Sequence, residues 1–242
     1  MIGVTIASTE FEEMAVQAAQ RFRRHTKTEK TIILSTQREK NYAEKLSIHR
    51  FITKDETICF FDSDLWFVRD CDLSSFENRK EFIGVHDAGC KPEFADNHFP
   101  YKDAITFGID PVKYFNGGLF IFNKTHVKAF EYARSIMSEM TINGGRKYID
   151  GKPLCDFGEQ SSLNYAMVKK KVPVRIISAR YNYMPFAVQH VGAEYIEDPF
   201  AIHAAGYGAD TRFPDRTAGQ MKMQALLGYE YKHKSGRTDI YY

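Results

Sequence analysis

The segment Phe60-Phe61-Asp62-Ser63-Asp64-Leu65-Trp66 is an apolar run that stops at two carboxylates separated by a single residue. The residues leading into it, Thr57-Ile58-Cys59-Phe60-Phe61, are β-branched and aromatic and too few for a helix, which predicts a buried strand. An open α/β sheet binds its ligands in the crevice at the carboxyl ends of its strands. Two aspartates placed there suit a divalent cation that in turn holds phosphates. This stretch therefore predicts a protein that handles a nucleotide diphosphate.

A second triplet of the same form, Asp70-Cys71-Asp72, follows shortly downstream. The triplet alone is a weak signal, because a chain of this length contains one by chance about half the time. No apolar strand leads into the second triplet, and Leu73-Ser74-Ser75-Phe76 follows it, so Asp70 or Asp72 is expected to cap a short helix. The context therefore selects Asp62 and Asp64 as the candidate metal ligands.

The apolar periodicity along the chain predicts an α/β sheet. Before the first triplet, strands are predicted at 2–7, 31–35 and 57–61, with a helix after Thr9 and another at about 39–50. This alternation is typical of a parallel, nucleotide-binding sheet. Farther along, strands are predicted near 81–85, 117–122, 172–177 and 201–203, and helices near 126–140 and 157–168. Residues 90–113 are predicted to form a loop and 143–153 a flexible connection.

The composition is that of an ordinary globular protein. Among 242 residues, 33 are basic and 31 acidic, and the formal charge of +2 argues against a dedicated nucleic-acid binder. The sequence contains no signal-like segment and no apolar stretch of about 20 residues. The four cysteines form no C-x-x-C pair, which favours reduced thiols. We therefore expect a single domain without a transmembrane segment, in the cytoplasm.

Four short motifs follow one another in a fixed order. They are Phe61-Asp62-Ser63-Asp64, Phe115-Asn116-Gly117-Gly118, Gly158-Glu159-Gln160-Ser161-Ser162-Leu163-Asn164 and Ile202-His203-Ala204-Ala205-Gly206. In this the chain resembles glycosyltransferase family 8, the group of glycogenin and the bacterial lipopolysaccharide galactosyl- and glucosyltransferases. That family shows a D-x-D after a strand, then F-N-[SG]-G, D-Q-x-x-L-N and H-x-x-G. Each motif is weak alone, but the four in order, over roughly the first 210 residues, make the resemblance specific.

The resemblance implies a GT-A type nucleotide-diphospho-sugar transferase fold, a Rossmann-like mixed sheet flanked by helices. It implies Mn²⁺ (or Mg²⁺), a nucleotide-sugar donor, usually a UDP-hexose, and transfer with retention at the anomeric carbon. Residues 1–85 would form the nucleotide-binding half of a single 1–242 domain, 86–205 the donor and acceptor half, and 206–242 an acceptor-side or tail segment.

The same resemblance makes Asp62, Asp64 and His203 the metal ligands. Two carboxylates and one neutral imidazole suit Mn²⁺ and leave positions for phosphates. Without the other motifs, His203 would be interpreted as a buried, hydrogen-bonded core histidine.

Gln160, Asp87 and Glu159 are the candidate catalytic residues that the resemblance implies. Gln160 would lie close to the anomeric carbon, and Asp87 would hydrogen-bond the donor sugar, although a loop-capping aspartate fits almost as well. Asp156 and Glu159 have the spacing of a helix cap and its partner, so a role of Glu159 at the helix terminus stays open. No residue stands out as a covalent nucleophile, and departure and attack on one face of the sugar is the default mechanism.

The remaining candidates would contact the nucleotide sugar: Ala7, Thr9, Phe11, Lys45, Asp62, Ser63, Asn116, Gly117, Gly118, Gly206 and Arg212. Phe11 takes the place of a base-stacking tyrosine but also fits the helix core, and Lys45 could equally be a solvated lysine. The family usually continues its last motif to a lysine that meets the diphosphate. Here Ala209 stands at that position, and Arg212 could supply the charge instead.

Two other classes of protein compete with this interpretation. A nucleotidyltransferase would need a glycine-rich, basic loop after its first strand, whereas Ala7-Ser8-Thr9-Glu10-Phe11 has no glycine. A non-catalytic sugar- or nucleic-acid-binding module would not need the complete set of metal-ligand candidates. The acceptor is expected to be a glycan, a lipid-linked sugar or another molecule, with a nucleic acid less favoured. The sequence indicates neither the acceptor nor the oligomeric state.

Overall fold

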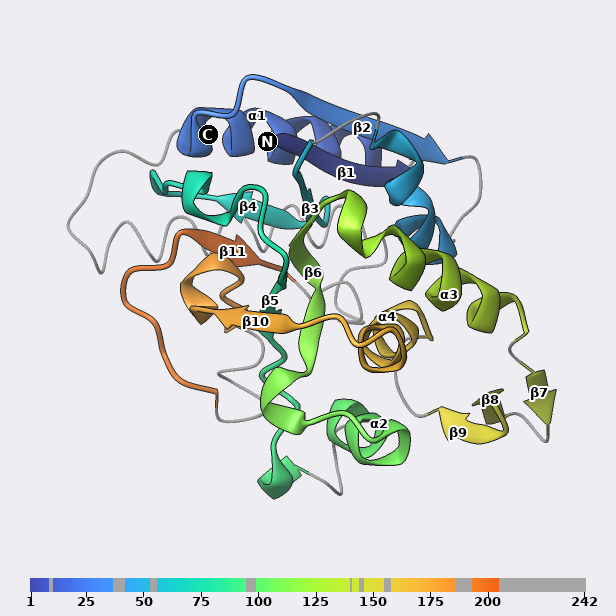
Figure 1. The fold of residues 1–242 in the computed structure, drawn as a ribbon. Coiled ribbons are helices and arrows are strands. Elements are labelled where there is room, and N and C mark those ends of the chain that lie inside the picture. The colour runs from blue at the N-terminus through green and yellow to red at the C-terminus, as the bar shows by residue number, and fades with distance from the viewer. Residues whose placement is uncertain are drawn as a thin grey trace.

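The computed structural model describes residues 1–8, 11–36, 42–52, 56–94, 99–139, 141–143, 146–154, 158–185 and 193–204 (Figure 1). The strands are β1 (Ile2–Ser8), β2 (Thr31–Thr36), β3 (Ile58–Phe61), β4 (Leu65–Phe67), β5 (Phe82–His86), β6 (Phe115–Phe122), β7 (Thr141–Asn143), β8 (Arg146–Ile149), β9 (Lys152–Leu154), β10 (Val174–Ile177) and β11 (Ala201–His203). The α-helices are α1 (Glu12–Thr26), α2 (Phe99–Phe107), α3 (Val127–Ser138) and α4 (Gly158–Lys169). The 3-10 helices are η2 (Tyr42–Phe51), η3 (Ser74–Phe76), η4 (Pro92–Phe94), η5 (Pro111–Lys113), η6 (Lys124–His126) and η7 (Ala179–Tyr181).

A six-stranded sheet in the order β10-β5-β6-β3-β1-β2 forms the centre of the molecule. Neighbouring strands are parallel except at β6, which runs antiparallel to both β3 and β5. Because β6 is reversed, its first residues lie beside the last residues of β3 and β5. The motif at the start of β6 is thereby brought to the same edge of the sheet as the residues that follow β3 and β5.

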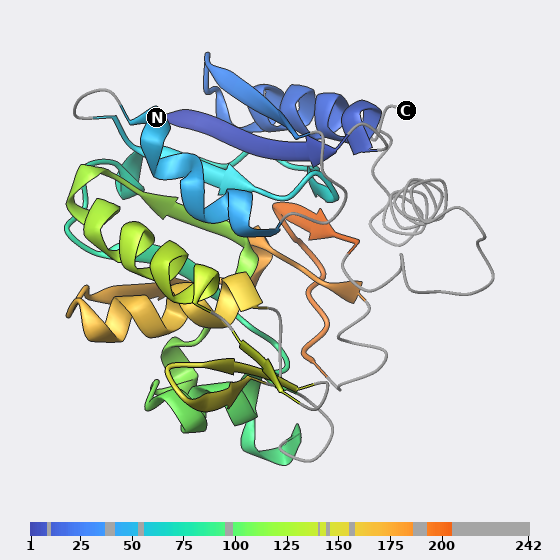
Figure 2. The same cartoon turned by 90° about the vertical axis from the view of Figure 1, so that its right-hand side faces the viewer.

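Both faces of this sheet are buried, as the apolar runs predicted. Successive residues point to opposite faces, so Phe60 and Phe120 belong to one cluster of buried side chains and Phe61 and Ile121 to another. The first cluster includes residues of η2, α3 and α4, and the second includes residues of α1 and β4. Figure 2 shows η2, α3 and α4 side by side over one face of the sheet.

Two smaller sheets complete the described part of the chain. β4 pairs antiparallel with β11, and β7, β8 and β9 form a three-stranded antiparallel sheet. In both Figures 1 and 2 the three-stranded sheet and α2 lie at the opposite end of the molecule from β1, β2 and α1. None of the described helices is long and apolar enough to cross a bilayer.

The structure corrects three expectations about local structure. The segment 90–113 is not only loop but contains α2, and Pro100 is tolerated there because it lies in the first turn of the helix. The segment 143–153 was expected to be a flexible connection but includes strands β8 and β9, joined where Asp150 and Gly151 adopt positive φ angles of 53° and 70°. The second predicted helix is present as the 3-10 helix η2.

Candidate active site

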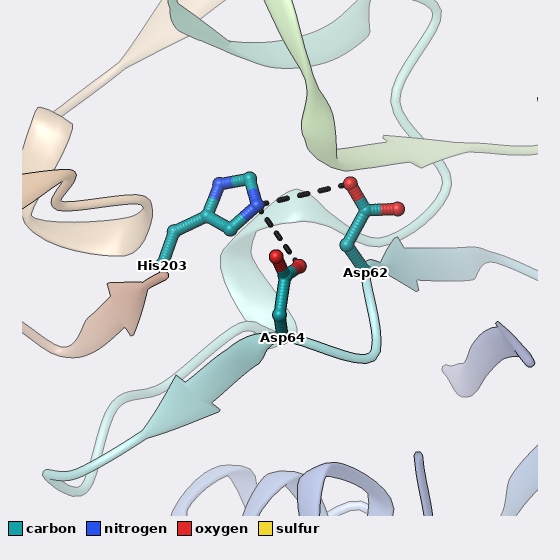
Figure 3. A group of neighbouring side chains, drawn as sticks. All are labelled: Asp62, Asp64 and His203. Carbon is teal, nitrogen blue, oxygen red and sulfur yellow. Dashed lines mark ion pairs between the residues drawn. The ribbon is translucent and has the colours of Figure 1, made fainter. Parts of the chain in front are cut away.

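Three side chains from distant parts of the sequence converge at the carboxyl end of β3. Asp62 follows β3, Asp64 precedes β4, and His203 is the last residue of β11. The antiparallel pairing of β4 with β11 places His203 opposite Leu65, and the N–H of Ala204 donates to the backbone oxygen of Asp64 at 3.0 Å. The imidazole points from the end of β11 toward both carboxylates (Figure 3). Its Nε2 atom lies 3.1 Å from Asp64 Oδ1 and 3.8 Å from Asp62 Oδ2.

These three side chains fit a divalent metal ion. Each offers one ligand atom, and the three atoms lie within 4.8 Å of one another. Around an ion with metal–ligand distances of about 2.1 Å, neighbouring ligand atoms lie about 3 Å apart and opposite ones about 4 Å apart. The separations of His203 Nε2 from the two carboxylates, 3.1 and 3.8 Å, fall in this range, and an O, O, N ligand set suits Mn²⁺ or a similar cation.

The charges of the cluster stabilise one another. Burial alone would lower the pKa of His203, but the charge and hydrogen bond of Asp64, with a further contribution from Asp62, outweigh burial and raise it. Burial likewise opposes ionisation of Asp64, yet His203 and Lys45 bring the pKa of that carboxyl below its usual value. Negative charge at this point is thus balanced by the nearby cations, and a bound metal ion would play the same role.

Lys45 and Glu159 extend the cluster on the side of Asp62. The Lys45 ammonium lies 2.7 Å from Asp62 Oδ1 and 3.0 Å from Oδ2, and 3.8 Å from Glu159 Oε1. Burial raises the pKa of Glu159 despite the opposing effect of Lys45. Burial lowers the pKa of Lys45, but the charges of Asp62 and Glu159 and the hydrogen bond of Asp62 reverse this and raise it. Lys45 is therefore a component of the site and not a solvated lysine, and Glu159 lies beside it. Asp156, its expected capping partner, lies outside the described residues.

Gly118, the second of the paired glycines at the start of β6, provides space for the imidazole. A Cβ atom added at Gly118 would lie 2.3 Å from His203 Cε1 and 2.7 Å from Nδ1, so only glycine fits beside this ring. At Gly117 the nearest atom to such a Cβ would be Gln160 Oε1, at the ordinary distance of 3.4 Å. The close approach expected at this motif thus occurs between Gly118 and a metal-ligand candidate.

A hydrogen-bonded group of Asp87, Asn116 and Gln160 lies next to the metal-ligand candidates. Asp87 Oδ2 accepts from Asn116 Nδ2 at 2.9 Å and from Gln160 Nε2 at 3.0 Å. Gln160 Oε1 accepts from the N–H of Gly117 at 2.7 Å, so both ends of its amide are held. Asp87 Oδ1 also accepts from the N–H of Gly89 at 2.9 Å, which is the loop-capping interaction that the sequence had left open. Asp87 therefore caps its loop and orients two other site residues.

The other predicted site residues fall into two groups. Ala7 lies near the end of β1, Ser63 lies in the turn between β3 and β4, and Phe11 is half-buried at the N-cap of α1. Its two interpretations, contact with the nucleobase and packing in the helix core, both stay predictions. Thr9, Gly206 and Arg212 lie outside the described residues, as does Ala209.

One residue of the site was missed from the sequence. Asn182 follows η7 and is 2% exposed, and it hydrogen-bonds both His203 and Asn116. It belongs to none of the four motifs, and its neighbours Tyr181 and Tyr183 give no signal of a polar site. Only the fold brings it between the metal-ligand candidates and β6.

Comparison with known proteins identifies the fold. No protein-family model matches the sequence, and neither does any curated protein. Among solved structures, the bifunctional glycosyltransferase WbbM is similar with a TM-score of 0.58 and 13% identity, over 92% of this chain and 49% of WbbM. This chain therefore spans about half the length of WbbM.

Two other solved structures match over nearly their whole length. The galactosyltransferase LgtC, in complex with donor and acceptor sugar analogues, has a TM-score of 0.55 and 12% identity, over 95% of this chain and 96% of that one. A glycosyltransferase involved in glycosylation of the major capsid of PBCV-1 has a TM-score of 0.54 and 14% identity, over 93% of this chain and 98% of that one. The chain thus has the GT-A fold of these glycosyltransferases, as the four motifs predicted.

Proposed function

We propose that this protein is a metal-dependent glycosyltransferase of the family 8 type. It would transfer a hexose from a nucleotide sugar, with UDP-hexose as the expected donor, to an acceptor with retention of anomeric configuration. The observation that carries the proposal is the convergence of Asp62, Asp64 and His203 at one edge of a GT-A sheet. The fold alone is compatible with other chemistry, whereas these three ligands at this edge suit a cation that binds a diphosphate.

In this proposal Asp62, Asp64 and His203 hold Mn²⁺ or Mg²⁺, which when bound would neutralise the charge of the departing nucleotide diphosphate. Lys45 keeps Asp62 in a fixed orientation and adds a positive charge at the same place. The lysine that the family places after its last motif is absent, so Lys45 and Arg212 are the candidates for additional contacts to the diphosphate. Phe11, Ala7 and Thr9 would contact the nucleobase side of the donor.

The donor sugar would lie against Asp87, Asn116 and Gln160. Their mutual hydrogen bonds fix the side chains before any ligand arrives, which lowers the cost of reorganisation in the transition state. Positive charge develops at the anomeric carbon of an oxocarbenium-like transition state, and amide and carboxylate oxygens stabilise it. Acceptor attack on the face from which the diphosphate leaves would give retention without a covalent intermediate.

The first test is hydrolysis of a panel of nucleotide sugars by the purified protein, with Mn²⁺ and with chelator, followed as release of the free nucleotide diphosphate. The donor sugar can be transferred to water in place of the acceptor, so the assay needs no known acceptor. Metal-dependent release from one donor would establish the class and name the sugar. If no donor is hydrolysed and calorimetry detects no Mn²⁺-dependent UDP binding, the proposal is wrong and a non-catalytic binding module becomes the better interpretation.

A nucleotidyltransferase is the second candidate, and one experiment distinguishes it. Such an enzyme would consume a nucleoside triphosphate and a sugar phosphate and release pyrophosphate, whereas the proposed enzyme releases a nucleoside diphosphate. The glycine-free segment after β1 argues against a triphosphate site. The acceptor, a glycan, lipid-linked sugar or other molecule, and the oligomeric state are not specified by the proposal.

A further inference from the structure

The side chain of Asn182 joins two parts of the candidate site that come from different strands. Its Oδ1 atom lies 2.8 Å from Nδ1 of His203, the ring nitrogen that faces away from the two aspartates. Its Nδ2 atom lies 3.0 Å from Oδ1 of Asn116, at the start of β6. The residue is buried, and a 3-10 turn holds its backbone, since its N–H donates to the carbonyl oxygen of Ala179 at 3.1 Å.

The direction of these hydrogen bonds follows from groups that can act in one way only. The backbone N–H of Gly118 can only donate, and it lies 2.8 Å from Oδ1 of Asn116, which fixes that atom as the acceptor. The amide nitrogen of Asn116 then faces Asp87 Oδ2, a carboxylate oxygen that accepts. The group of Asn182 that faces Asn116 must therefore be its NH₂ group. Its carbonyl oxygen must then face His203.

A carbonyl oxygen beside Nδ1 of His203 requires a proton on that nitrogen. Nε2 is the atom that faces Asp62 and Asp64, and without a metal ion its N–H donates to Asp64 Oδ1. A metal ion would replace that proton, and the neutral imidazole that keeps its proton on Nδ1 would present the lone pair of Nε2 to the ion. This is the arrangement that a histidine needs to bind a metal ion through Nε2. In metal sites the partner of the other ring nitrogen fixes the tautomer and the ring orientation, and its loss typically costs 10- to 100-fold in metal affinity.

We propose that Asn182 is a positioning residue that sets the tautomer and orientation of His203 for metal binding. Its amide also ties His203 to Asn116 and, through Asn116, to Asp87 and Gln160. One hydrogen-bonded chain thus connects the metal ligands to the side chains proposed to face the donor sugar. This inference rests on the metal site of the proposed function and adds the residue that orients it.

The test separates the two ends of the Asn182 amide. Asn182→Asp keeps an oxygen that accepts from His203 Nδ1–H but cannot donate to Asn116, whereas Asn182→Leu keeps neither bond. Calorimetry measures Mn²⁺ affinity of the purified protein without donor, and pulsed electron paramagnetic resonance detects the nitrogen coupling of a Mn²⁺-bound imidazole. We expect Asn182→Leu to weaken Mn²⁺ binding about 10- to 100-fold with loss of the nitrogen coupling. Asn182→Asp should retain the coupling and an affinity within about threefold of wild type, because carboxylates commonly support metal-binding histidines.

Asn123→Leu is the matched control. Asn123 is also a buried asparagine whose amide is used at both ends, as it accepts from the N–H of Thr125 and donates to the carbonyl oxygen of Arg79. It precedes η6, outside the site, so this variant should lower the unfolding temperature and leave Mn²⁺ affinity unchanged.

Each outcome decides the proposal. A folded Asn182→Leu protein with wild-type Mn²⁺ affinity and nitrogen coupling would overturn it, and so would an Asn182→Asp protein that loses affinity as severely as the leucine variant. If Asn182→Leu does not fold, the aspartate variant decides alone, with retained affinity and coupling in support and loss of either against. Absence of Mn²⁺ binding or of nitrogen coupling in the wild type would overturn the metal site itself, and the Asn182 role with it.

Discussion

The two aspartate triplets have the same form but opposite surroundings. In both, one aspartate lies beside a histidine, since Asp64 Oδ1 is 3.1 Å from His203 and Asp70 Oδ1 is 2.9 Å from His25. At the first triplet the other carboxylate, Asp62, also approaches the imidazole, and the cluster is shielded from solvent. At the second, the side chain of Asp70 is 75% exposed, and Asp72 Oδ1 accepts from the N–H of Ser74 at 2.8 Å. The N-cap of η3 is Leu73, so the prediction that Asp70 or Asp72 caps this helix is wrong, and Asp72 contacts its first residue from one position earlier.

The difference shows that the triplet alone does not make a candidate metal site, which requires a third side chain from a distant part of the sequence. Asp62 lies at the sheet edge because it follows the parallel strand β3, and His203 lies beside it because β11 pairs with β4. Among the described residues, only the first triplet takes part in a group of three side chains close enough to share a metal ion. The following substitutions test that distinction.

The largest effect is expected for Asp64→Ala. In the proposed site this substitution removes one of the three candidate metal ligands and the carboxylate that lies 3.1 Å from His203. Metal-dependent release of nucleotide diphosphate should fall by more than about 10³-fold, because the loss of even one charge-stabilising donor costs 10²- to 10³-fold in other enzymes. The measurement is donor hydrolysis with Mn²⁺, with circular dichroism to confirm that the protein is folded. Retained turnover in a folded variant would remove Asp64 from the site.

His203→Ala should have the next largest effect. Losing a metal ligand should weaken Mn²⁺ binding more than losing the side chain that orients that ligand. Mn²⁺ affinity should therefore fall by at least about 100-fold. The preference among nucleotides should not change, because in the proposed site the imidazole would bind the metal ion and not the nucleobase. Calorimetry with Mn²⁺ and competition with different nucleoside diphosphates measure the two effects. A variant that unfolds would instead support the interpretation of His203 as a core histidine.

Gly118→Ala should weaken the site without removing any ligand. The added Cβ overlaps the ring of His203, so the imidazole must move, and we expect Mn²⁺ affinity to fall about 10- to 100-fold. Gly117→Ala is the matched control, because its Cβ would make only an ordinary contact with Gln160 and should leave Mn²⁺ affinity within about twofold. Equal effects of the two substitutions in Mn²⁺ titrations would contradict the steric argument.

The smallest effect is expected for Asp70→Ala in the second triplet. The substitution removes an exposed pair with His25, and such pairs contribute about 0–1 kcal/mol. Donor hydrolysis and Mn²⁺ affinity should both stay within about twofold of wild type. If Asp70 proved essential while Asp64 did not, the assignment of the two triplets would be reversed.

Much of the central sheet could be predicted from the sequence because its strands are apolar on both faces. A short run of apolar residues such as Ile58–Phe61 is typical of a strand buried on both faces. The residues that follow such a strand are expected at the carboxyl edge of the sheet. Asp62 follows such a strand directly, whereas His203 reaches the same edge through the separate pairing of β11 with β4.

The peripheral elements were harder to predict because their signals are ambiguous. Pro100 indicates a loop unless the first turn of a helix is known to begin there, and Gly151 indicates flexibility unless strands on either side pair. These decisions depend on partners distant in the sequence. Asn182 could not be found at all, since its role depends only on what surrounds it in three dimensions.

The place of His203 at the end of β11 also has a consequence for how the site comes into being. The two aspartates leave the ribosome long before their imidazole partner, and β11 must pair with β4 before all three meet. A nascent or truncated chain that ends before β11 would contain the triplet but no complete set of ligands. Bringing residues so far apart in the sequence together costs chain entropy, and the contacts of the folded protein offset this cost. Under the proposed function, metal binding would thus require that the chain has been synthesised and folded as far as β11.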